Sequence, residues 1–229
     1  SPAPGAASPA DPQAVGGQHF GPVTLSPLAA AEPLLGMPAA FLLDPATGLE
    51  TQLAGLAGWR PVVDPTGRWV VFWSGTLAFD PAGATWRPFQ GQLEMASWAS
   101  VSSAVDAQSG AAAAHALPLG SATDWDLRWD QAGQHLGVWI ADANNPGLGS
   151  LSLLTIDPAT GETSSSAPAL LSDAPAARGF ALQDGQLVWA SPPGQDGTGS
   201  RLSILAWSGA NAGKTSVQSI ENGALIVVH

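Results

Sequence analysis

Residues 58–89 of the chain read GWRPVVDPTGRWVVFWSGTLAFDPAGATWRPF. The apolar run at residues 59–63 ends at DPTG (residues 64–67), where proline fixes φ and glycine accepts a positive φ, so we expect a strand that ends in a hairpin turn. Residues 69–73 (WVVFW) are β-branched or aromatic throughout, as in a strand that is covered on both faces. A third run, residues 76–79, ends at a second turn, DPAG. Turns at intervals of about 8–12 residues predict an all-β sandwich, barrel or propeller.

Two kinds of hairpin alternate along the chain from residue 39 onward. One kind ends in an Asp-Pro-Ala-Thr-Gly turn, which occurs in residues 41–48 (FLLDPATG) and again in residues 153–161 (LLTIDPATG). The other kind has a glycine turn followed by an apolar strand, and its glycines are Gly67, Gly91, Gly133, Gly185 and Gly223. Alternating hairpins of two kinds fit a β-propeller, in which each blade has four antiparallel strands.

The number of glycine turns predicts a closed propeller of four to six blades, with five as the expected count. The first repeat is a lone hairpin at residues 39–53, and the chain ends with a hairpin at residues 219–228. We expect these two hairpins to complete one blade, because closure of the ring removes exposed strand edges. A β-sandwich is the alternative fold. Residues 1–18 are rich in Pro, Ala and Ser and are expected to form a flexible tether to a single propeller domain at residues 19–229; an ordinary frayed terminus is the alternative.

The composition narrows the classes of function. The chain has 18 acidic against 7 basic residues, and a net charge of −11 repels the phosphate backbone of a nucleic acid. The absence of cysteine excludes disulfides, thiolate zinc sites and cysteine nucleophiles. No stretch approaches the roughly 18 apolar residues of a membrane span, so we expect a membrane to be involved only through a segment outside this sequence. The chain begins at Ser1, which suggests that a signal or anchor lies upstream.

Three segments that contain the glycine turns resemble the repeat of TolB-type propellers, P-x-W-S-P-D-G followed by an apolar strand. They are residues 61–67 (PVVDPTG), 127–133 (LRWDQAG) and 180–185 (FALQDG). This resemblance to TolB-type, WD-repeat-like propellers implies a protein outside the cytoplasm that binds proteins or peptides. Similar propellers also form the outer portions of membrane-anchored bacterial regulators, including anti-sigma factors.

The residues offer no assembled catalytic set. His19, His115, His135 and His229 lack metal-binding spacing, so we expect neither metal nor cofactor and interpret His135 as structural. The G-x-S-x-G nucleophile motif is absent. Most aspartates lie in turns, where the side chain caps its own backbone. These features favour a non-catalytic protein. A carbohydrate-binding or carbohydrate-active propeller, of the lectin or glycosidase type, is the alternative.

Seven of the ten tryptophans fall into two groups. We predict that Trp69, Trp73, Trp139 and Trp189 lie in the core, because they follow glycine turns in apolar strands. The second group could be exposed, because its members lie where the first strand of a blade enters the channel; they are Trp59, Trp86 and Trp125.

The arginines predict an anion-binding site at the mouth of the central channel. When the glycine turns are superposed, Arg60, Asp126 and Arg178 fall at the same position, and Arg87 follows Trp86 as Arg60 follows Trp59. The first strand of each blade is the innermost, so these side chains are expected to surround the mouth. The predicted site consists of Arg60, Arg87, Asp126 and Arg178 with Trp59, Trp86 and Trp125. The alternative is that each arginine pairs with a neighbouring carboxylate, Asp126 included, and holds adjacent blades together.

Together these features predict a non-catalytic sensor or interaction domain outside the cytoplasm, periplasmic or at the cell surface. It would be tethered to a membrane through residues 1–18, and the resemblance to TolB-type propellers implies the outer portion of a regulator such as an anti-sigma factor. Its ligand would be a protein, a peptide or an acidic small molecule, because arginine pairs bidentately with carboxylates.

Overall fold

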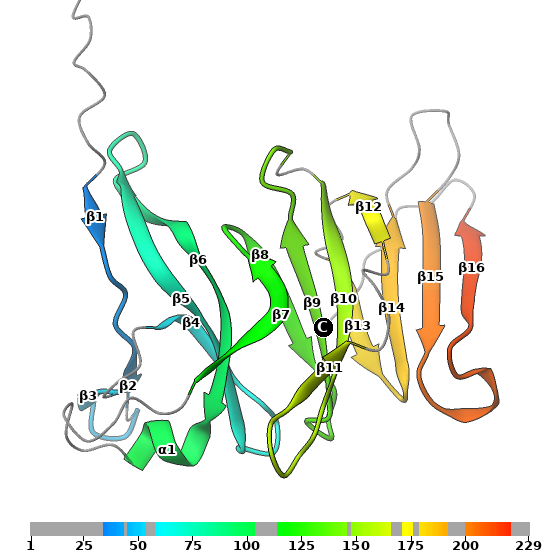
Figure 1. Cartoon of the computed structure of the whole chain (residues 1–229), viewed down its shortest axis with the longest axis horizontal. Helices are drawn as coiled ribbons and strands as arrows, with labels where there is room; N and C mark the ends of the chain where they lie inside the picture. The colour runs from blue at the N-terminus through cyan, green and yellow to red at the C-terminus, as the bar shows by residue number, and fades with distance from the viewer. Residues whose placement is uncertain are drawn as a thin grey trace, which may run out of the picture.

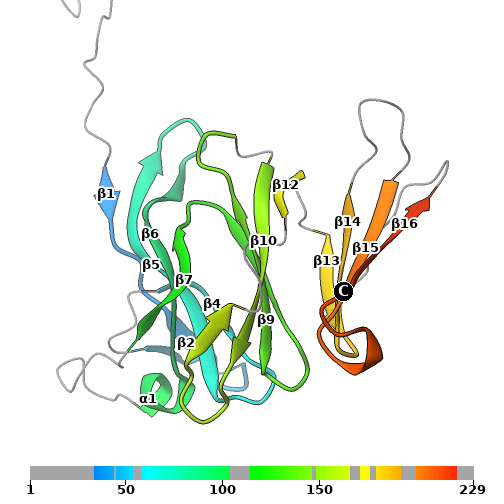
Figure 2. The same ribbon diagram turned by 45° about the vertical axis from the view of Figure 1, so that its right-hand side comes forward.

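The protein's structure is a computed structural model that describes residues 34–43, 45–53, 58–103, 114–145, 148–165, 171–175, 179–191 and 200–220. These residues are nearly all β, and their strands form a row of antiparallel sheets from β1 at one end to β16 at the other (Figure 1). The same order of sheets is visible after a turn of 45° about the vertical axis (Figure 2). The predicted all-β class is therefore confirmed. The predicted tether at residues 1–18 lies outside the described residues.

The first sheet is built around the two longest strands of the described chain. β4 and β1 pair with one edge of β5, β6 pairs with the other edge, and β7 pairs with β6. The bounds are β1 (Leu35–Gly36), β4 (Gly58–Val63), β5 (Trp69–Asp80), β6 (Thr85–Ser97) and β7 (His115–Ser121). A short helix, α1 (Trp98–Ser103), follows β6.

The next two sheets repeat the same meander of four antiparallel strands. The second sheet contains β8 (Trp125–Trp129), β9 (His135–Ala141) and β10 (Leu148–Ile156), and both β11 (Thr163–Ser165) and β12 (Leu171–Pro175) pair with β10. The third contains β13 (Phe180–Gln183), β14 (Gln186–Ser191), β15 (Ser200–Ala206) and β16 (Thr215–Ile220), with a 3-10 helix (Gly209–Asn211) before β16. A separate hairpin consists of β2 (Phe41–Leu43) and β3 (Glu50–Gln52).

Hydrophobic cores lie between successive sheets, so that a central strand is covered on both faces. In β5, Val71 and Trp73 belong to the core shared with the second sheet, whereas Val70 and Phe72 belong to the core shared with the β2–β3 region and α1. In β9, Val138 faces the first sheet's core, and the next residue belongs to the core shared with the third sheet. Sheets packed face to face in a row are compatible with either of the two predicted folds, a propeller or a sandwich. The uninterrupted apolar run WVVFW is thus explained by two-sided burial.

Three of the predicted glycine turns are present. Gly67, Gly133 and Gly185 adopt φ values of 71°, 64° and 78° in the turns that join β4 to β5, β8 to β9 and β13 to β14. Asp184 also has a positive φ of 50°, which makes the third connection a two-residue Asp-Gly turn.

The turn predicted at Gly91 is not formed, and this prediction is wrong. Gly91 lies inside β6, where it pairs with Gly75 of β5. A Cβ atom at Gly91 would lie 2.3 Å from the Ser74 carbonyl oxygen and 2.4 Å from the Trp73 ring, so this glycine permits a close approach of two strands and forms no turn. The runs at residues 69–73 and 76–79 consequently belong to one strand, β5, although the sequence predicts two.

The described residues form three full sheets and one hairpin, arranged as an open row. β2 and β3 pair only with each other among these residues, and β16 pairs only with β15. The two ends of the row lie on opposite sides of the molecule in Figure 1. The expected contact between the hairpin at residues 39–53 and the one at residues 219–228 is therefore not formed by the described residues, and residues 221–229 lie outside them. The described residues therefore do not show five blades: the count of five includes a turn at Gly91, which is not formed, and one at Gly223, which lies outside the described residues.

Aspartate side chains hold the hairpin turns together, as the sequence predicts. Asp64 is 3% exposed and accepts hydrogen bonds from the backbone N–H groups of Thr66, Arg68 and Trp69 and from the Thr66 hydroxyl. Burial acts to raise the pKa of this carboxyl, but the hydrogen bonds outweigh burial and hold the pKa below its ordinary value of 3.8. The turn also touches the second sheet, because a Cβ atom at Gly133 would lie 2.4 Å from the Asp64 carboxylate.

Asp64→Asn is expected to lower the free energy of unfolding by about 2 kcal/mol near neutral pH, because hydrogen bonds to a charged acceptor are lost. A folded-state pKa below the ordinary value means that the charged carboxylate stabilises the fold above pH 3.8 and loses this effect as the pH falls through the folded-state pKa. Urea unfolding at a series of pH values should therefore show the gap between wild type and variant narrowing in acid. Asp157→Asn, in an exposed turn, is the control with a smaller loss. A gap that stays constant with pH would contradict this role.

Candidate ligand-binding groove

An open groove of about 410 Å³ lies between the first and second sheets, between β4 of the first and β8 of the second. One wall is the end of β4 and its turn, with Arg60, Val62, Val63 and Pro65. The other wall is β8, from Trp125 to Trp129. The groove thus runs between the strands that a propeller places innermost, which is where the sequence predicts an anion site.

The floor of the groove includes Trp125, which stacks on a second buried tryptophan. The rings of Trp73, from β5, and Trp125, from β8, lie 5.8 Å apart at an angle of 10°. The Trp73 indole N–H donates a hydrogen bond of 2.6 Å to the Ala122 carbonyl, which ties the same indole to the residues that lead into β8. Trp125 is 3% exposed, so the expectation that it could be exposed is wrong: the stacking partner from the first sheet covers it.

Arg60 lies above this floor. Its guanidinium carbon is 5.5 Å from the centre of the Trp125 ring, within the range of a cation–π interaction between the two sheets. The Arg60 side chain is exposed, and no carboxylate of the described residues forms an ion pair with it. It therefore presents a positive charge to the groove in a chain whose net charge is −11.

The backbone of Arg60 is held in an unusual conformation. Its φ of 53° lies in the left-handed region, and the pairing of β4 with β5 shifts register between Trp59 and Val62. The other non-glycine residues with positive φ in the described chain, Ala84 and Asp184, lie in hairpin turns, whereas Arg60 lies within a strand. A left-handed arginine costs on the order of 1 kcal/mol. Strain of this kind, at a bulge that redirects a side chain, is typical of binding sites.

The opposite wall carries an ion pair. Arg128 Nη1 lies 2.6 Å from Asp126 Oδ1, and both side chains are partly exposed. The Arg128 guanidinium also lies 5.7 Å from the centre of the Phe180 ring in the third sheet. Arg128 is missing from the predicted site, although its position two residues after Asp126, on the same face of a strand, is a signal for it. Asp126 therefore pairs with an arginine, as the alternative interpretation expects. The arginine belongs to the same strand, however, so this ion pair does not join two sheets.

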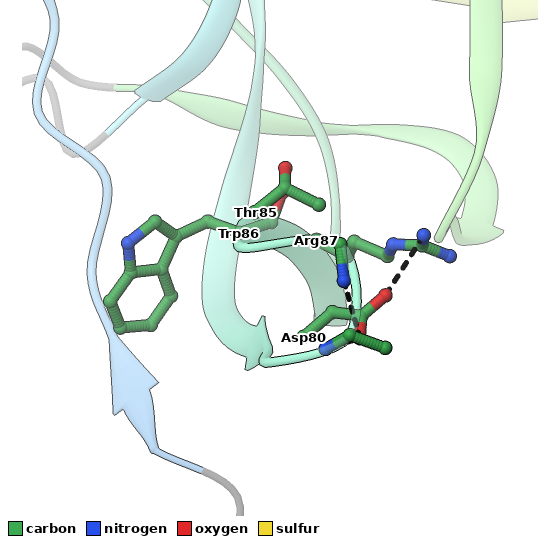
Figure 3. A network of polar contacts seen from close by, with 6 residues as sticks. Asp80, Thr85, Trp86 and Arg87 are labelled. Carbon is green, nitrogen blue, oxygen red and sulfur yellow. Dashed lines mark hydrogen bonds and ion pairs between the residues drawn. The ribbon is translucent and has the colours of Figure 1, made fainter.

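The structure separates the other predicted residues from this groove. Arg87 lies in β6, close to the β5–β6 turn, and pairs with Asp80 at 2.9 Å (Figure 3). Trp86 points away from that pair toward β1 (Figure 3). Its ring meets the Phe79 ring edge-on, with the ring centres 5.4 Å apart. The predicted equivalence fails because Trp86 and Arg87 follow a turn, whereas Trp59 and Arg60 precede one.

The remaining predicted positions are accounted for as follows. Trp59 is half-buried in β4, where it pairs with Trp73 and packs against the shared core. Arg178 lies outside the described residues. The predicted core positions Trp73, Trp139 and Trp189 are buried, and Trp69 is partly buried against the core that contains Trp73.

The other ionisable groups near the inner strands serve the turns. Asp130 accepts hydrogen bonds from the N–H groups of Gln134 and His135, and its second oxygen lies 2.9 Å from His135 Nδ1. The His135 ring also stacks on Trp207 at 4.7 Å, which agrees with a structural histidine. His115 contacts the Gly161 carbonyl at 3.0 Å. Within the described part of the chain, no three His, Asp or Glu side chains are grouped as metal ligands would be.

A second groove of about 600 Å³ lies between β8 and β13. Arg128 and Trp129 line both grooves, so the end of β8 forms the wall between them. The helices of the described chain are six and three residues long, far short of a membrane span.

Comparisons with known proteins give no family. No family model matches the chain, and no curated protein matches it. Among solved structures it is similar to a candidate 6-phosphogluconolactonase from Bacteroides uniformis ATCC 8492, with a TM-score of 0.39 and 11% identity over 80% of this chain and 48% of that one. It is also similar to a puromycin hydrolase mutant complexed with PGG, with a TM-score of 0.32 and 21% identity over 69% of this chain and 21% of that one. This chain spans about half of the first protein and about a fifth of the second, and at these TM-scores neither likeness bears on its function.

Arg60→Gly is expected to be more stable than Arg60→Ala by about 1 kcal/mol, because glycine adopts the left-handed conformation without strain. Both variants lose the stacking on Trp125, so the comparison isolates the backbone. Thermal unfolding of the two proteins measures the difference. An alanine variant as stable as the glycine variant would show that residue 60 carries no backbone strain.

Proposed function

We propose that this chain is a non-catalytic interaction domain that binds a carboxylate of a peptide or protein partner in the groove between β4 and β8. One observation carries the proposal: the exposed guanidinium of Arg60 stands over Trp125 and has no carboxylate partner among the described residues. Arginine presents a planar fork of donors that matches a carboxylate. A backbone held in a strained conformation to place this side chain supports a binding role.

The carboxylates around the groove support a binding role more than a catalytic one. Asp126 is the single carboxylate among the residues that line it, and Arg128 occupies that carboxylate. A glycosidase requires two carboxyl groups that face each other across the substrate. The nearby Asp64 and Asp130 accept hydrogen bonds within their own turns.

A carbohydrate-binding role is the second candidate, and Trp129 is the observation that favours it, because this residue lines both grooves. Aromatic faces bind sugar rings, and an acidic sugar carries the carboxylate that Arg60 would recognise. The Trp125 ring, by contrast, already has the Arg60 guanidinium over it.

The wider role we propose is that of a sensor domain outside the cytoplasm, tethered through residues 1–18 to a membrane segment of a regulator. The Pro/Ala/Ser composition of those residues and the acidic charge of the chain support this location. Fractionation of the producing cells with an antibody against the chain should recover it with the membrane, exposed to added protease. Recovery in the cytoplasm would contradict the location.

The binding role can be tested with a pool of linear hexapeptides that end in a free carboxylate and with the same pool amidated. The immobilised full chain should retain the carboxylate pool, measured by mass spectrometry, and much less of the amidated pool. Arg60→Ala should reduce retention about tenfold, because a hydrogen bond to a charged group is worth about 1.5–3 kcal/mol. Arg87→Ala is the matched control, since Arg87 is an exposed arginine whose partner is Asp80.

Equal retention by the Arg60→Ala and Arg87→Ala variants would contradict the proposed site. Retention of acidic oligogalacturonates in place of the peptides, abolished by Arg60→Ala, would favour the carbohydrate-binding candidate.

A further inference from the structure

Strand β8 has one edge that no strand of the described chain occupies. β9 pairs with its other edge along the full length from Trp125 to Trp129, and β8 ends the order of strands in the second sheet. In an antiparallel strand every second residue directs its N–H and C=O groups away from the paired neighbour. On the free edge of β8 such groups face the groove.

The side chains of Asp126 and Arg128 occupy these groups at Leu127. The Leu127 N–H donates to Asp126 Oδ1 at 2.9 Å, and Arg128 Nη1 donates to the Leu127 carbonyl at 2.8 Å. The two side chains also pair with each other at 2.6 Å. Local bonds from side chain to backbone of this kind compete with the ladder of a neighbouring strand. The Asp126–Arg128 ion pair therefore occupies the backbone groups of Leu127 with which an added strand would pair.

The opposite wall of the groove offers no equivalent edge. Pro61 has no N–H group, and the left-handed Arg60 interrupts the regular backbone of β4. One wall can thus pair with a backbone, and the other supplies a cation. An extended peptide with a carboxylate matches both walls, whereas a sugar acid matches only the arginine.

We infer that the partner's segment binds as an extended strand that pairs with β8 at Leu127. It displaces the side chains of the Asp126–Arg128 ion pair from the Leu127 backbone, while its carboxylate binds Arg60. This inference rests on the proposed function and adds the mode of binding. Asp126 is then a built-in competitor of the ligand. The Asp126 side chain is 20% exposed and the Arg128 side chain 32% exposed, so the ion pair can separate without disrupting the core.

The carboxylate-ending hexapeptide pool tests this mode on the full chain. Asp126→Ala should raise retention of the pool about fivefold, because the ligand no longer displaces a side-chain hydrogen bond and an ion pair. Asp80→Ala is the matched control: it breaks the Arg87–Asp80 pair outside the groove and should leave retention unchanged. The same pool with alternate backbone nitrogens methylated cannot form a ladder and should be retained by the wild type about tenfold less.

The outcomes separate the mode from the function. If Arg60→Ala lowers retention while Asp126→Ala and backbone methylation have no effect, the groove binds a carboxylate without strand addition and the inference is overturned. If Arg60→Ala has no effect, the proposed function itself is overturned. Should Asp126→Ala fail to fold, the methylated pool on wild type decides the question. Retention of oligogalacturonates in place of peptides, or self-association of the chain through this groove, would also overturn it.

Discussion

The stack of Trp73 on Trp125 is the interaction on which the groove depends. It places a large buried aromatic ring from each of two sheets in one interface, and such pairs contribute about 0.5–1.5 kcal/mol beyond the area they bury. The hydrogen bond from Trp73 to the Ala122 carbonyl fixes the start of β8 relative to β5. β4 and β8 are thereby held opposite each other, and the Trp125 ring is fixed beneath the Arg60 guanidinium.

The turns add a second constraint between the same sheets. The buried carboxylate of Asp64 closes its own turn and meets the Gly133 turn of the second sheet, where there is no room for a side chain. The second and third sheets are joined differently, by the guanidinium of Arg128 over the Phe180 ring. Turns with a buried or half-buried aspartate thus end the inner strands, and the Asp64 turn also fixes the spacing of the first two sheets.

Much of this could be predicted from local chemistry, and the errors share a cause. The WVVFW run reveals burial on both faces, and the Asp-Pro turns specify hairpins without help from the rest of the chain. The prediction of a turn at Gly91 is wrong because a glycine in a turn and one at a close approach of two strands look alike in sequence. The prediction for Arg87 is wrong because the similarity of Trp86–Arg87 to Trp59–Arg60 does not show whether the residues precede or follow a turn. The burial of Trp125 depends on a ring from another sheet, and a single sequence does not show that contact.

The central claim is that the Arg60 guanidinium, seated on Trp125, is where a carboxylate binds. Nuclear magnetic resonance of the full chain with labelled arginine side chains observes each guanidinium directly. On addition of the carboxylate-ending hexapeptides, the Nε–H signal of Arg60 should shift progressively, while that of Arg87 should remain where it is. An unchanged Arg60 signal, or equal shifts for both arginines, would contradict the account.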